Sequence, residues 1–132
     1  MLLSHKKQKM IKDLAILALI VLGLDVIFLG SMHNYFNWQV RMVQGSALQL
    51  DYLAAGLCYI VIIGAAYKFM ILRPETTIWD AAILGWSVYL IYELTNKAIF
   101  RNWASTTVFL DGLWGGILFA LTLYIVRLIR AY

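Results

Sequence analysis

Four long apolar stretches fill most of the chain and are separated by short polar connections. They cover residues 14–36, 52–72, 78–100 and 107–129, so each holds 21 to 23 residues. A helix needs about 20 apolar residues to cross the hydrocarbon core of a bilayer. The pattern therefore predicts an all-α integral membrane bundle of four transmembrane helices, forming a single domain over residues 1–132.

The composition agrees with the apolar pattern. Hydrophobic residues make up 63% of the chain and charged residues 14%, whereas soluble domains average about 45–50% and 25%. The first apolar stretch follows a basic segment, as in a signal peptide. Its 23 residues are too many for a signal-peptide core, and no small-residue cleavage site follows. We therefore expect a retained first transmembrane helix.

Two segments lie outside the apolar stretches. The basic tail, residues 1–13, carries Lys6, Lys7, Lys9 and Lys12, which we expect to contact anionic lipid or a protein partner. Residues 37–50 mix apolar and polar side chains, and Gly45-Ser46 is expected to interrupt them. This predicts an interfacial segment on the membrane surface with Trp38 at headgroup level. A lid over a substrate site is the alternative.

The distribution of Lys and Arg predicts the orientation. Four spans place both termini on one side, together with eight of the eleven basic residues. The other side holds Arg41, Lys97 and Arg101. Because cytoplasmic loops carry the excess of basic residues, the termini are predicted to be cytoplasmic or in an equivalent space. The basic residues form no continuous face, so nucleic acid is not an expected partner.

Three carboxylates interrupt the apolar stretches, namely Asp25, Glu93 and Asp111. On the predicted topology they lie roughly 16, 10 and 6 Å below the outer boundary. Ionisable residues at such depths are costly and usually have a role. Neighbouring polar and aromatic residues complete a candidate polar cluster: Asp25, Tyr92, Glu93, Asn96, Lys97, Asp111 and Trp114.

The candidate polar cluster allows three interpretations. It can be a hydrogen-bonded structural cluster that fixes the helix register. It can be a proton relay or cation site, because three carboxylates face only Lys97 and Arg101 as local cations. It can also be catalytic, with Glu93 or Asp111 as general base. Lys97 follows Glu93 by four residues, the spacing of a helical ion pair.

Small residues predict close helix packing. Gly112, Gly116 and Ala120 recur every four residues in the fourth stretch, and such spacing lets membrane helices approach closely. Gly56 and Gly64 are expected to do the same in the second stretch. The pattern suits a compact bundle or a dimer.

Motifs for established chemistries are missing from the sequence. It contains no phosphate-binding loop, haem-ligand pair, zinc motif or Ser/His/Asp set with supporting context. The single cysteine, Cys58, has no partner for a disulfide and is expected to be a buried packing residue. We therefore expect no cofactor, no metal and no assigned catalytic residue.

Three short motifs resemble those of a known family. They are Asp25-Val26-Ile27-Phe28-Leu29-Gly30, then Tyr92-Glu93-Leu94-Thr95-Asn96 with the later Trp103, and Asp111-Gly112-Leu113-Trp114-Gly115. The chain resembles, over roughly residues 22–121, the small four-helix membrane proteins catalogued as domain of unknown function 2177. Glu93 stands where that family usually has Asp, and Phe28 where it usually has Trp.

The resemblance implies the four-helix architecture but no activity. Similar proteins in bacteria and in some large DNA viruses leave either a cell membrane or the internal membrane of a virus particle as the location. The sequence favours a non-enzymatic, multi-pass structural or assembly component, such as a virion membrane or minor capsid-associated protein. Its expected partners are the bilayer and other protein subunits or copies of itself. A proton- or cation-coupled carrier and a lipid-modifying enzyme are the alternatives.

Overall fold

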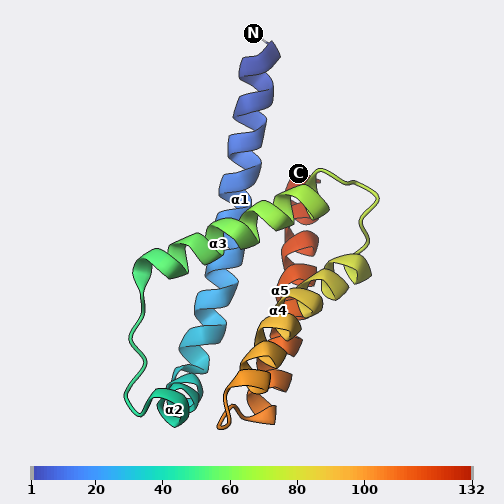
Figure 1. Cartoon of the computed structure of the whole chain (residues 1–132). Coiled ribbons are helices and arrows are strands. Elements are labelled where there is room, and N and C mark those ends of the chain that lie inside the picture. Colours follow the sequence, from blue (N-terminus) through green and yellow to red (C-terminus); the bar gives the residue numbers. More distant parts are fainter. Residues whose placement is uncertain (1, 132) are drawn as a thin grey trace.

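The computed structural model describes residues 2–131, which contain helices and no strand. The helices in chain order are α1 (Leu2–Ser31), α2 (His33–Gln44), α3 (Tyr52–Ala66), the π-helix η1 (Tyr67–Ile71), α4 (Ile78–Ile99) and α5 (Ser105–Arg130) (Figure 1). The all-α prediction is therefore confirmed.

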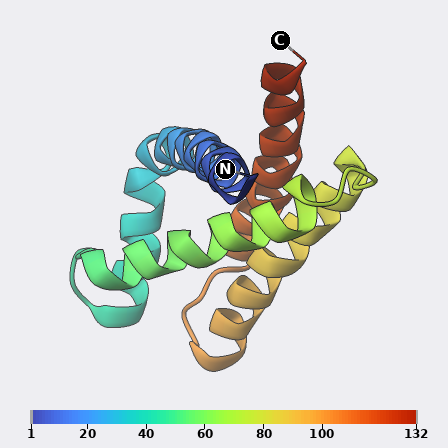
Figure 2. The same cartoon turned by 90° about the horizontal axis from the view of Figure 1, so that it is seen from above.

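The helices form an open bundle around an antiparallel hairpin. α4 and α5 pack side by side along much of their length, and α1 lies against α5 (Figure 1). α3 crosses the bundle obliquely, which is clearest from above in Figure 2. α1 begins and α5 ends at the same end of the bundle, here called the terminal end. α2 and the α4–α5 connection lie at the opposite end.

Three helical segments are long and apolar enough to cross a membrane. They are Ser4–Ser31, Tyr52–Ile71 and Ser105–Arg130, which supports an integral membrane location. α4 has 22 residues and so the length of a span. It carries Asp80, Glu93 and Lys97, however, which lower its mean hydropathy. Of the four predicted spans, three are therefore supported by the length and hydropathy of their helices.

The first predicted helix has different limits in the structure. It was expected over residues 14–36, but α1 begins at Leu2 and includes the lysines of the basic tail. Lys, Gln and Leu favour helix, which accounts for the longer start. α1 ends at Ser31, and the chain turns at Met32 into the separate helix α2. α2 ends at Gln44, and the following Gly45 has a left-handed φ of 76°, which suits glycine.

Glycines bring α4 and α5 into backbone contact. A Cβ added to Gly85 would lie 2.0 Å from the carbonyl oxygen of Gly115. Gly112 and Gly116 similarly leave room for Leu90 and Trp86. The stripe of small residues in α5 is therefore occupied by α4 of the same chain.

The expected role of the α3 glycines is wrong. A Cβ added to Gly56 or Gly64 would meet nothing within 4 Å. α3 crosses its neighbours at a steep angle (Figure 2), so these glycines do not lie at a close helix contact. Cys58 on the same helix is exposed rather than buried, because α3 buries only Ile62 and Ala66.

The apolar core joins α1, η1 and α5 near the terminal end. Its most buried side chains include Leu17, Met70, Leu118, Phe119 and Leu123. In η1 the Leu72 N–H donates to the Tyr67 carbonyl at 3.0 Å, and η1 buries Met70 and Ile71. An ion pair of 2.6 Å between Arg130 and Asp13 also connects α5 to α1.

Candidate functional site

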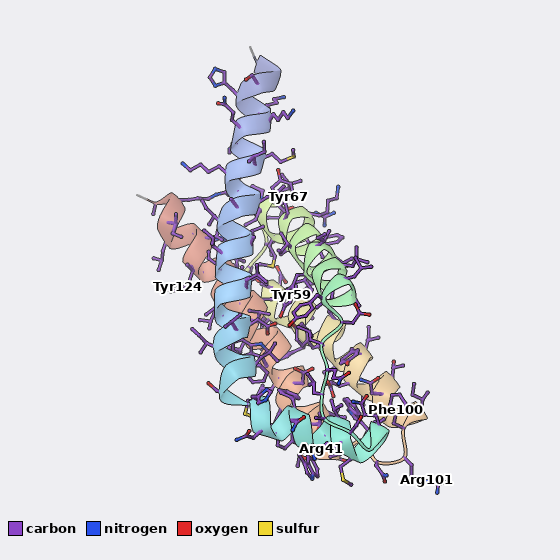
Figure 3. All side chains as sticks on the ribbon, turned by 90° about the vertical axis from the view of Figure 1, so that its left-hand side faces the viewer. Arg41, Tyr59, Tyr67, Phe100, Arg101 and Tyr124 are labelled. Carbon is purple, nitrogen blue, oxygen red and sulfur yellow. The ribbon has the colours of Figure 1, made fainter. Side chains whose placement is uncertain are left out.

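Asp25 is the centre of a hydrogen-bond cluster that joins three helices. It lies in α1 and is 5% exposed. The indole Nε1 of Trp114 in α5 donates to one carboxylate oxygen at 3.0 Å. The hydroxyl of Tyr59, which projects from α3 toward α1 (Figure 3), donates to the other. Asp25 therefore fixes the positions of α3 and α5 relative to α1.

Phe28 supports the same cluster from one turn further along α1. Its ring stacks on Trp114 with centroids 4.5 Å apart and planes 9° from parallel. Phe28 stands at the position where the family resemblance expects Trp. The substitution removes an indole N–H but keeps an aromatic surface against Trp114. The stacked ring holds the Trp114 indole in the orientation that reaches Asp25.

Glu93 forms a second polar contact, between α4 and the α4–α5 connection. Glu93 is 1% exposed and accepts a hydrogen bond of 2.8 Å from the indole of Trp103. Asp111 lies in α5, the helix that packs against α4, and is partly buried. Two of the three carboxylates singled out in the sequence therefore lie on the two packed helices α4 and α5.

The other predicted cluster residues lie at its edge. The expected Glu93–Lys97 ion pair is absent among the described residues, where Lys97 instead donates to the Trp103 carbonyl at 3.1 Å. Glu93 faces the buried helix contact, whereas Lys97 reaches the α4–α5 connection. Tyr92 is 57% exposed. Arg101 lies at the same end of the bundle as Arg41 (Figure 3).

Gln39 in α2 forms a third polar contact that sequence reasoning missed. Its side chain is fully buried. Its Oε1 accepts from the Ala104 N–H at 2.9 Å and from the Thr107 hydroxyl at 2.6 Å. Its Nε2 donates to the Asn102 carbonyl at 3.0 Å. α2 is therefore fastened to the α4–α5 connection, which favours an anchored interfacial helix over a mobile lid.

The polar side chains described above form hydrogen-bonded contacts between helices. No buried side-chain nitrogen or oxygen lacks a hydrogen-bond partner in the described part of the chain. Within residues 2–131, no three His, Cys, Asp or Glu side chains are grouped so that they could hold a metal ion. Polar side chains that bond across helices stabilise membrane bundles.

Comparison with known proteins places the chain in a family. No curated protein and no solved structure matches it significantly. The family described as "Predicted membrane protein (DUF2177)" matches residues 10–127, which include Asp25, Glu93 and Asp111. This match confirms the resemblance drawn from the sequence motifs. Because it covers most of the chain, the protein belongs to this family of membrane proteins.

Proposed function

We propose that the protein is a non-enzymatic, four-span component of a larger membrane assembly. In this proposal its buried carboxylates hold neighbouring segments together by hydrogen bonds. The bonding of Asp25 carries the proposal. Both of its oxygens accept hydrogen bonds, one from α3 and one from α5. A carboxylate bound in this way positions helices, and a substrate could reach it only by displacing Tyr59 or Trp114.

The burial of Glu93 supports the same assignment over catalysis. A general base must come within hydrogen-bond reach of a substrate, yet Glu93 is 1% exposed and is held by Trp103. α4 serves as the fourth span in this proposal because its 22 residues would extend about 33 Å. Its charged residues are either buried within the bundle, as Glu93 is, or lie near its ends, where water lowers their cost.

The outer face of α3 is the surface that we propose for contact with other subunits. Large apolar side chains remain open there, with Leu53 75% exposed and Val61 70% exposed. In a membrane this face meets either lipid or another protein. Such an assembly can belong to a cell membrane or to the internal membrane of a virus particle. The basic terminal end would face the cytoplasm or its equivalent.

Purification from the native membrane tests the assembly role. The full chain, extracted in mild detergent, should be recovered at fixed stoichiometry with other subunits in quantitative mass spectrometry. A version with Leu53→Ala and Val61→Ala should lose part of these subunits, whereas Leu19→Ala and Ile27→Ala, at equally open positions on α1, serve as the matched control. Recovery of the unaltered protein as a free monomer or dimer would overturn the assembly role.

The carboxylates within the apolar helices, with Glu93 buried in α4 and Asp111 partly buried in α5, favour one second function, transfer of protons across the membrane. Carboxyl groups inside membrane helices can act as proton relays. In this case vesicles containing the purified chain should show proton flux reported by an entrapped pH dye. Glu93→Gln and Asp111→Asn should each reduce the flux at least tenfold, and Glu75→Gln, at an exposed position, should leave it unchanged. Absence of flux in the unaltered chain rejects this function.

A further inference from the structure

A groove of about 620 Å³ opens at the terminal end of the bundle. Its walls come from the first turns of α1, from η1 and from the last turns of α5. Tyr67, at the start of η1, marks its position in Figure 3. The volume falls within the range of sites for small organic ligands. The groove is separate from the clusters around Asp25 and Glu93.

The rim of the groove is strongly basic. Lys6 and Lys9 approach from α1, and Arg127 and Arg130 approach from α5. Among the described residues, Asp13 is the one carboxylate in the lining, and it pairs with Arg130. Lys6 and Lys9 form no ion pair with the described residues. The rim therefore carries an excess of positive charge even after the Arg130–Asp13 ion pair is counted.

The floor of the groove is apolar and lies deeper in the bundle. Met70 and Leu123 line it and are almost fully buried. Along α5, the apolar lining residues Leu123 and Val126 precede the basic Arg127 and Arg130. Cations therefore lie toward the membrane surface and apolar side chains toward the bilayer interior. This order matches a phospholipid, which carries its phosphate above its acyl chains.

We propose that this groove binds an anionic glycerophospholipid, with its phosphate between Lys6, Lys9 and the α5 arginines. The first part of an acyl chain lies on Met70 and Leu123. Basic pockets between membrane helices on the cytoplasmic side are known to suit anionic headgroups. Arg127 also donates to the carbonyls of Pro74 and Thr76, which holds the α3–α4 connection beside the groove. The bound lipid would thereby link α1 to α5 and η1.

Native mass spectrometry of the full chain in detergent tests the groove with phosphatidylglycerol as probe. The test variant combines Lys6→Gln with Lys9→Gln. The matched control combines Lys7→Gln with Lys12→Gln, which removes the same charge from the same part of α1 but does not alter the groove lining. Each basic residue near a membrane surface contributes enough that losing two should weaken phosphatidylglycerol binding about thirtyfold. The control should change it less than threefold.

The outcomes distinguish a specific lipid site in the groove from nonspecific attraction of anionic lipid by the lysines of α1. Equal losses in both variants would overturn the groove, because diffuse charge on α1 would then explain the binding. Unchanged binding in the test variant would overturn it as well. Phosphatidylcholine should bind much more weakly than phosphatidylglycerol, and inorganic phosphate at millimolar concentration should not displace the lipid. Displacement by inorganic phosphate would show an anion site without the acyl contact and would contradict the proposal.

Discussion

Replacing Gly85 with alanine should destabilise the bundle by about 3 kcal/mol, at the upper end of the usual cost of overpacking. The added Cβ would lie 2.0 Å from the Gly115 carbonyl oxygen and 2.9 Å from the Phe119 Cβ. Backbone atoms cannot move aside as a flexible side chain can, so α4 and α5 must separate. Unfolding of the purified chain in detergent micelles by increasing fractions of dodecyl sulfate measures the change.

Gly56→Ala is the matched control for this prediction. It makes the same chemical change in a membrane helix, at a position where the new Cβ would meet nothing within 4 Å. Alanine is the better helix former by roughly 0.5–1 kcal/mol, so stability should stay equal or rise. If Gly85→Ala behaved like Gly56→Ala, the close approach of α4 to α5 would be wrong.

Replacing Gln39 with leucine should cost about 3 kcal/mol and release α2 from the bundle. The substitution removes the side-chain partner of the Ala104 N–H, of the Asn102 carbonyl and of the fully buried Thr107 hydroxyl. Each buried polar group that loses its partner costs about 1–3 kcal/mol. Amide hydrogen exchange should therefore accelerate in α2 and in residues 100–104, and global stability should fall in the same dodecyl sulfate titration.

Gln44→Leu provides the comparison within the same helix. Gln44 is exposed, and its side chain donates only to the nearby Ser46 and Ala47 carbonyls. Its loss should change stability by less than about 0.5 kcal/mol, as for most surface substitutions. Slow exchange in α2 of the Gln39→Leu protein would show that other contacts anchor this helix.

The buried carboxylates show how much of the candidate site could be predicted from the sequence. Asp25, Glu93 and Asp111 could be identified in advance because a charge within an apolar stretch is costly and needs compensation. Trp114 was also included, and the structure pairs it with Asp25. The role of Tyr59 was not foreseen, since many aromatic residues in membrane helices serve only as packing.

Gln39 is a buried residue whose role could not be predicted from the sequence. Within the mixed segment 37–50 a glutamine is expected to face water or lipid headgroups, because its neighbours include several polar residues. The structure instead buries it against residues more than 60 positions away in the sequence. The turn at Met32 directs α2 under the bundle, and this direction is what gives Gln39 its partners.

The sequence by itself determined the class of protein, the main apolar spans and the positions of the buried carboxylates. These follow from local properties, namely the length of apolar stretches and the cost of charge in hydrocarbon. Only the tertiary structure decided which glycines permit close packing, which donors reach Asp25, and how α1 and α5 form a basic groove. Such contacts depend on the angles and register at which distant helices cross, and no local pattern specifies those.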